Sequence, residues 1–342
     1  MRIRALVFRI WRQFLHDKRT LALMLLAPLF VMTLISLVFN GSTYKPKIGL
    51  IHVPVALSQQ LAKESVTLSS YASSASALSA LKNQSIDAYV DFHHGQLAIK
   101  LEGSNPSTSQ AVLMNLQKLT QPAITRQALS QPTVSYLYGS ASMTSFDNFG
   151  PVLIGFFAFF FVFLVAGISF LNERTTGTLD RLLATPIKRY EVVLGYVLGY
   201  GAFTIVQAFL IAWFSVDILG MMMTGSLFTL LIVTLLLSMS ALTFGIFISS
   251  FANSEFQIMQ FIPIVVVPQI FFSGLFNIAT MAPWLRWLSY LMPLYYGAEA
   301  MRNVMIRGKG IDVIGLDLLF LLALSLVFIV LNVFTLRKYR KV

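Results

Sequence analysis

Six long apolar segments constrain this chain of 342 residues more than any other feature of its sequence. At a rise of about 1.5 Å per residue, a helix of about 20 apolar residues crosses the roughly 30 Å hydrocarbon core of a membrane. A helix also pairs its backbone polar groups internally, as a spanning segment must do in lipid. We therefore predict six membrane-spanning helices, over Thr20–Phe39, Val152–Leu171, Val192–Val216, Leu227–Ser249, Phe256–Phe276 and Ile314–Leu336.

Charged residues are few, and they gather beside the apolar segments. They make up 11% of the chain, against about 25% in soluble proteins, and 56% of the residues are hydrophobic. The net charge is +11, and six of the 25 basic residues lie in the first nineteen positions, four in 172–191 and four in the last six. Basic flanks of spans mark the cytoplasmic side, so both termini and the 172–191 segment should be cytoplasmic. This placement argues against a nucleic-acid partner.

Residues 1–19 have the pattern of an amphipathic helix. Apolar side chains would share one face and basic or polar ones the other, namely Ile3, Leu6, Val7, Ile10, Trp11 and Phe14 against Arg2, Arg9, Arg12 and Gln13. A basic helix with an aromatic residue on its apolar side lies in the membrane interface. The alternative is a signal peptide, but no small-residue cleavage site follows residues 20–39.

Residues 40–149 are rich in serine, threonine, glutamine and asparagine, and we predict that they form a small α/β domain. The patterns predict strands over Ile48–Val53, Val66–Ser69, Ile86–Phe92 and Gln96–Leu101, and helices over Leu57–Glu64, Ala75–Asn83 and Ser107–Leu129. Because this domain follows one outward span (20–39), it should be extracytoplasmic. The adjacent His93 and His94 would point to opposite faces of a strand, and the chain has no cysteine, so we assign no metal site.

Residues 150–342 would form the rest of the membrane domain. Pro263 and Pro268 should kink the fifth span, since each removes a backbone donor. The segment 277–312 would lie outside, as an interfacial or re-entrant helical pair with tryptophans and tyrosines at headgroup level. The predicted fold class is therefore an α-helical polytopic membrane protein, with six transmembrane helices and one α/β extracytoplasmic domain between the first and second.

The polar 172–191 segment between the second and third spans has the pattern of a short folded element. Gly177 suits the left-handed close of a helix, Thr178 suits the N-cap of a new one, and Asp180 suits its first turn. Leu179, Leu182 and Leu183 would form one apolar face, and Pro186 would end the helix. A short amphipathic helix of this kind fits a groove in another protein.

The same segment resembles a known family. Its residues Glu173-Arg174-x-x-Gly177-Thr178-Leu179-Asp180-x-Leu182-Leu183-x-Thr185-Pro186 are similar to the cytoplasmic loop of ABC-2 type transporter permeases, and they depart from it at Thr175, where the family often has a second acidic residue. Further likeness lies in Glu102–Pro106, Ser273–Gly274, Met281–Leu285, Pro293–Tyr296 and Glu299–Arg302.

The resemblance implies the permease subunit of an ATP-driven exporter in a bacterial plasma membrane. It implies a separate ATP-binding cassette subunit in two copies, a second permease chain, identical or homologous, and ATP with Mg²⁺ on the partner only. The coupling residues it implies are Glu173, Arg174, Gly177, Thr178, Leu179, Asp180, Leu182, Leu183 and Pro186. An amphiphilic, lipid-like or drug-like cargo would suit the bulky apolar fifth span.

The residues themselves agree with a chain that is not an enzyme. The sequence contains no G-x-x-x-x-G-K-[ST] loop for a nucleotide and no constellation of catalytic residues at a membrane boundary, so we assign no catalytic or cofactor-binding residue. No predicted span has an ionisable residue near its midpoint, which disfavours an ion-coupled carrier. Two other classes stay open: a membrane sensor whose external domain binds a ligand, and a membrane-embedded enzyme.

Overall fold

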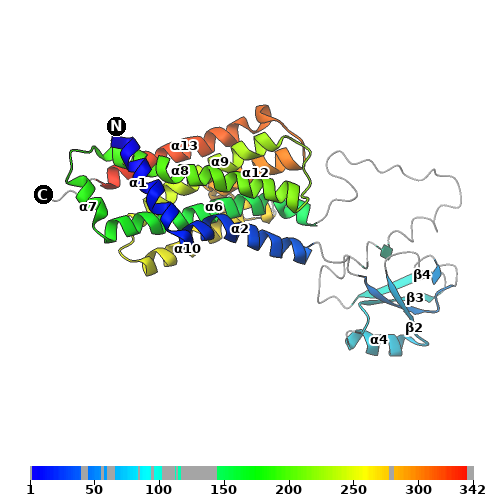
Figure 1. Ribbon diagram of the computed structural model, residues 1–342. Helices are drawn as coiled ribbons and strands as arrows, with labels where there is room; N and C mark the ends of the chain where they lie inside the picture. Colours follow the sequence, from blue (N-terminus) through cyan, green and yellow to red (C-terminus); the bar gives the residue numbers. More distant parts are fainter. Residues whose placement is uncertain are drawn as a thin grey trace. The chain divides into compact units, whose positions relative to one another are not determined.

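The computed structural model describes residues 2–39, 45–54, 58–59, 66–83, 85–93, 96–101, 112, 115–116, 145–276 and 281–336. The chain divides into two compact units, one of residues 1–40 and 136–342 and one of residues 41–135 (Figure 1). Each unit is described by itself.

The larger unit is a bundle of helices. In chain order it contains α1 (Arg2–His16), α2 (Lys18–Phe39), α6 (Ser145–Thr175), α7 (Thr178–Leu183), α8 (Arg189–Trp213) with the π-helix η1 (Phe214–Ile218), α9 (Leu227–Ser249), α10 (Glu255–Ile270) with the π-helix η2 (Phe271–Leu275), α11 (Pro283–Ser289), α12 (Pro293–Met305) and α13 (Ile311–Thr335).

Six of the described helices are long and apolar enough to cross a membrane, namely α2, α6, α8 with η1, α9, α10 with η2, and α13. The predicted fold class is therefore confirmed in its six spanning helices and in the small sheet-containing unit between the first and second of them in the sequence. The second span is longer than its apolar segment suggested, because α6 begins at Ser145 and continues to Thr175. The fifth helix continues through Pro263 and Pro268 and then changes into η2, where Gly274 has a φ of 84°.

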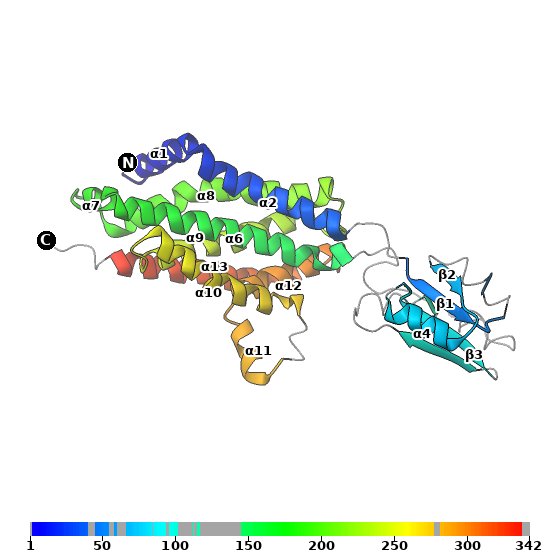
Figure 2. The ribbon, with the colours of Figure 1, turned by 90° about the horizontal axis from the view of Figure 1, so that it is seen from below.

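Helices α6 and α9 lie side by side at the centre of the bundle (Figure 2). Their backbones come very close, since a β-carbon added at Gly245 of α9 would lie 2.6 Å from the Phe163 carbonyl oxygen of α6. Lipid supplies no hydrophobic force between spanning helices, so small residues that permit close van der Waals contact hold them together. Position 245 therefore has no room for any side chain larger than that of glycine.

The segment 277–312 contains two described helices that differ in their surroundings. Helix α11 exposes Trp284 and Trp287, the aromatic side chains expected at headgroup level. Helix α12 instead packs against α6, α9 and α13, and its Leu294 and Met301 are fully buried. Only α11 therefore has the surface of an interfacial helix.

The smaller unit contains a four-stranded sheet in the order β2–β1–β3–β4. Strand β1 (Lys47–Ile51) pairs in parallel with β2 (Thr67–Ser70) and β3 (Ala88–His93), and β3 pairs antiparallel with β4 (Gln96–Leu101). Helix α4 (Ser74–Lys82) begins after Ser73, whose hydroxyl accepts a bond from the Ser76 N–H. The four strands and this helix lie within two residues of the predicted bounds, whereas Glu102–Pro106 and most of 57–64 and 107–129 lie outside the described residues.

Helix α1 packs on α8 through one buried stripe. Leu6, Ile10 and Phe14 are buried, and the first two face Gly195 and Gly199 of α8. Trp11, predicted on the same apolar face, is instead exposed at the side of the contact, where its Nε1 donates to the Gly199 carbonyl over 3.0 Å. The N-terminal helix is thus a packed part of the bundle.

Asp17 separates α1 from α2 and caps the start of the first span. Its carboxylate accepts from the Thr20 hydroxyl at 2.5 Å and from the Thr20 backbone N–H at 3.1 Å. These hydrogen bonds lower the pKa of the Asp17 carboxyl below its ordinary value. An acidic N-cap of this kind satisfies donors that the first turn of a helix leaves unpaired.

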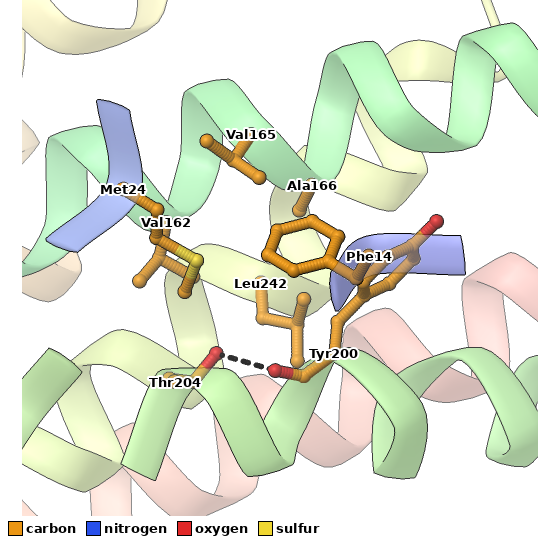
Figure 3. Close-up of a pocket in the computed structure, with 8 residues that line it drawn as sticks. All are labelled: Phe14, Met24, Val162, Val165, Ala166, Tyr200, Thr204 and Leu242. Carbon is orange, nitrogen blue, oxygen red and sulfur yellow. Dashed lines mark hydrogen bonds between the residues drawn. The ribbon is translucent and has the colours of Figure 1, made fainter. Parts of the chain in front are cut away.

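Figure 3 shows the joint at which α1 and α2 meet the rest of the bundle. Phe14 and Met24 lie against α6, α8 and α9, and the Thr204 hydroxyl donates to the Tyr200 carbonyl within α8 over 3.1 Å. The space between these side chains is too small for a water molecule. These side chains therefore belong to the packed core, and they do not form a binding site.

We predict that Gly199→Ala weakens the α1–α8 contact. An added β-carbon would lie 2.9 Å from Ile10 Cδ1 and 3.0 Å from Ile10 Cβ, and the second atom cannot move without the helix. Overpacking of this kind costs about 1–3 kcal/mol, so the purified protein should unfold at a lower temperature.

Gly315→Ala in α13 is the matched control, because nothing lies within 4 Å of its added β-carbon. Alanine is the better helix former by about 0.8–1 kcal/mol, so this variant should unfold no earlier than the wild type. Equal losses in both variants would contradict a specific α1–α8 contact.

Candidate functional site

The 172–191 segment forms a compact turn at one end of the bundle (Figure 1). Helix α6 ends at Thr175, and Gly177 reverses the chain with a φ of 71°. The expected N-cap at Thr178 is wrong: Gly177 takes the N-cap position, and Thr178 is the first residue of α7. The reason is that only Thr176 and the left-handed Gly177 connect the two helices, while the Thr178 hydroxyl bonds the Thr176 hydroxyl instead.

The leucines of α7 face the chain's own core. Leu179 is 1% exposed and Leu183 is 9% exposed, both within the main hydrophobic cluster, and Leu182 is half-buried against it. This corrects the expectation that all three would be available as anchors for a partner's groove. The short turn at Gly177 leaves α7 beside α6, so its apolar face finds the nearest apolar surface within the bundle. The residues that α7 and the following turn expose are Asp180, Arg181, Ala184, Thr185 and Pro186.

Glu173, one of the coupling residues that the resemblance implied, is buried in a three-residue network. Its side chain is 2% exposed, and its Oε2 accepts from Arg9 Nη2 at 2.8 Å and from the Tyr196 hydroxyl at 2.8 Å. Arg9 Nη2 also donates to the Tyr196 oxygen over 3.0 Å. A buried carboxylate requires such partners, since an uncompensated one is strongly destabilising.

Arg9 stays charged in this setting. Burial would lower the pKa of its guanidinium, but the nearby Tyr196 and Glu173 together raise that pKa above its ordinary value. The network therefore joins a fixed positive charge of α1 to the C-terminal end of α6 and the N-terminal part of α8.

The Arg174 side chain binds backbone carbonyl groups at a different helix end. Its Nη1 donates to the Ala252 carbonyl over 3.0 Å and also to the Ser249 carbonyl, so it binds the last turn of α9 and the connection to α10. Arg2 of α1 contacts the second half of the segment. Its Nη1 donates to the Pro186 carbonyl over 2.6 Å and lies 3.6 Å from the Glu191 carboxylate. Motion of this segment would thus move α1, α6, α8 and the α9–α10 connection together.

Sequence reasoning placed Glu173 and Arg174 in the site but missed Arg2, Arg9 and Tyr196. Arg9 was predicted on the polar face of an interfacial helix, and nothing local shows that its partner lies 164 positions away. The one signal in the sequence was the position of Glu173, two residues after the apolar segment 152–171, because a carboxylate that is buried there needs a partner.

A cavity of about 230 Å³ lies between α10, α13 and the turn joining α11 to α12. Its walls are apolar except for Gln269, whose Oε1 accepts from the Leu294 backbone N–H at 3.0 Å. The cavity is below the roughly 300–1,000 Å³ of sites for drug-sized ligands. Within the part of the chain that the structure describes, no three His, Cys, Asp or Glu side chains cluster as metal ligands would.

A family model described as ABC-2 family transporter protein matches residues 18–334 of this chain. The chain belongs to this ABC-2 family. The match covers all six spans, the 172–191 segment and the smaller unit between the first two spans.

Relatives of known name agree with this membership. ABC transporter G family member 20 of Dictyostelium discoideum is 24% identical over 286 residues, which cover 82% of this chain and 37% of that protein. Probable multidrug ABC transporter permease YbhS of Escherichia coli K12 is 30% identical over 160 residues, 46% of this chain and 42% of YbhS. Inner membrane transport permease YhhJ of the same organism is 25% identical over 178 residues, 51% of this chain and 47% of YhhJ. The chain thus spans less than half the length of each of these relatives.

For this ABC-2 family chain, we predict a strong energetic coupling between Arg9 and Glu173. Arg9→Met alone leaves a buried carboxylate without its cation and should destabilise the protein by about 3 kcal/mol. Arg9→Met combined with Glu173→Leu removes both charges and should be clearly more stable than Arg9→Met alone. Thermal unfolding of the two single variants and the double variant measures the coupling, and purely additive losses would contradict it.

Proposed function

We propose that this chain is the permease subunit of an ATP-driven exporter and that the 172–191 segment receives the movement of a separate ATP-binding cassette subunit. The observation that carries the proposal is the network at the inner end of α6, which ties this segment to α1, α8 and the α9–α10 connection. A push on a segment so connected reaches several spans at once. Its exposed charged surface is open to a partner.

The partner supplies the chemistry in this proposal. Two ATP-binding cassette subunits would hold ATP and Mg²⁺, and two permease chains, identical or homologous, would form the pathway. This chain would itself hydrolyse nothing, in agreement with the absence of a phosphate-binding loop from its sequence. The names of relatives, a transport permease and two proteins called ABC transporters, support the assignment.

The cargo we propose is amphiphilic, either lipid-like or drug-like. The name of YbhS, a probable multidrug permease, supports this class. The cavity beside α10 supports it too, since an apolar wall with the single amide of Gln269 suits a molecule that is largely apolar with few polar groups. At about 230 Å³ it would take one part of such a molecule.

We predict that the exposed face of α7 carries the contact with the ATP-binding subunit. Arg181→Glu reverses an exposed charge without touching the core, so the protein should fold normally and retain roughly tenfold less of that subunit when it is purified from its native membrane.

Leu179→Ala is the contrasting variant. It opens a cavity in the core and should lower the unfolding temperature, by a loss of about 2–5 kcal/mol. Full retention of the ATP-binding subunit by Arg181→Glu, together with reversals at Asp180 and Lys188, would show that this segment only connects two spans.

The proposed orientation has a direct test, because the chain has no cysteine of its own. Ser74→Cys in α4 and Lys188→Cys before α8 place single thiols at exposed positions of the two units. A membrane-impermeant maleimide should label Ser74→Cys in intact cells and Lys188→Cys only after permeabilisation. The reverse pattern would put the 172–191 segment on the outside, beyond the reach of any cytoplasmic ATPase.

A further inference from the structure

The polar side of α1 carries an open hollow that the transport proposal does not use. It has a volume of about 340 Å³ and is lined by Arg9, Arg12, Gln13 and His16. These positions follow the helical spacing of i, i+3, i+4 and i+7, so they form one stripe along the helix. The stripe brings two guanidinium groups, an amide and an imidazole together.

The accessible wall of the hollow is mostly the apolar stems of these side chains, and it is their polar ends that suit a phosphate group. Arg12 has no side-chain partner among the described residues, and Arg9 uses only Nη2 for Glu173 and Tyr196. His16 Nδ1 lies 2.7 Å from the Arg12 carbonyl and must donate to it, which fixes the ring, and Nε2 then donates to a phosphate oxygen only when the ring is protonated. Arginine forks and neighbouring donors are the groups that bind phosphate oxygens most strongly.

The acidic residues nearest to this stripe are already engaged. Glu173 is held by Arg9 and Tyr196, and Asp17 accepts two hydrogen bonds from Thr20. Neither carboxylate forms an ion pair with Arg12 among the described residues. Of the four side chains that line the hollow, two are guanidinium groups and none is acidic.

The neighbouring surface places the hollow at the depth of lipid headgroups. Beside it on α1 run three exposed apolar side chains, Phe8, Trp11 and Leu15, with exposures of 68%, 42% and 58%. The first span, α2, starts at Lys18, and its own exposed side continues with Leu23, Leu26 and Phe30. His16 thus lies less than one turn from the start of a spanning helix, where basic and aromatic side chains meet the headgroups.

We propose that Arg9, Arg12, Gln13 and His16 bind the phosphate of an anionic membrane lipid, while Phe8, Trp11 and Leu15 rest on its acyl region. The apolar stripe favours a lipid over a free phosphate, because a free phosphate has no apolar part to cover three exposed apolar side chains. Arg9 belongs both to this hollow and to the buried network. A bound lipid therefore stabilises α1 in its place on α8.

The test uses the full chain, purified in detergent and mixed with equal amounts of phosphatidylglycerol and phosphatidylcholine of the same acyl chains. Native mass spectrometry counts the lipids that stay bound. The wild type should retain phosphatidylglycerol preferentially, and Arg12→Gln with His16→Gln should reduce that preference by about fivefold or more, as expected for each basic group lost near an anionic surface.

Arg4→Gln is the matched control. Arg4 is an exposed arginine of the same helix that does not line the hollow, so its loss should leave the preference unchanged. An equal loss in Arg4→Gln would mean diffuse attraction and would overturn the site. An unchanged preference in Arg12→Gln with His16→Gln would overturn it as well.

Two further measurements distinguish a lipid phosphate from a free anion and from a protein partner. Displacement of phosphatidylglycerol by millimolar inorganic phosphate would assign the hollow to a free anion and overturn the lipid assignment. Loss of a copurifying ATP-binding subunit in Arg12→Gln with His16→Gln, with the lipid preference intact, would assign it to a protein partner. Since neither lipid measurement involves the ATP-binding subunit, the lipid site can fail while the proposed function stands.

Discussion

Backbone polar groups inside a bilayer have no water to pair with, and this constraint shapes the bundle wherever a helix is interrupted. Gln269 Oε1 accepts the Leu294 N–H at the start of α12, and Arg302 Nη2 donates to the Gly274 carbonyl where η2 ends. Arg174 binds the carbonyls at the end of α9 in the same manner. The polar side chains near the spans thus complete helix ends, the places where a helix leaves its own groups unpaired.

The same rule explains why the candidate site is tied to several helices rather than being a loop surrounded by solvent. Glu173 needs a cation because it is buried, Arg9 supplies one from α1, and the two glycines of α8 let α1 come close enough to do so. The cost of leaving either charge alone keeps these three helices in one arrangement. A segment that is held so tightly can transmit a displacement, whereas a solvated loop would absorb it.

The burial of Leu179 and Leu183 changes which part of α7 can meet another protein. A helix of six residues has room for one apolar face, and here that face belongs to the bundle. What remains for a partner is a small polar surface around Asp180 and Arg181. Such a surface favours contacts governed by charge and shape, since exposed ion pairs contribute only about 0–1 kcal/mol each.

The sequence by itself determined the spans, the family and the position of the candidate site. Length and hydropathy fix a spanning helix locally, and the motif from Glu173 to Pro186 needs no knowledge of the fold. Short-range patterns also placed the strands of the smaller unit within two residues, because alternation and turn residues act between near neighbours.

Only the tertiary structure decided which surfaces are inside. The leucines of α7 have the same helical pattern whether they face a partner or their own bundle, and nothing in that pattern gives the direction of the turn at Gly177. Arg9 and Glu173 are separated by 164 positions, so their pairing depends on how α1 crosses α8. Burial and long-range ion pairing depend on how the whole chain packs, so a local sequence pattern does not predict them.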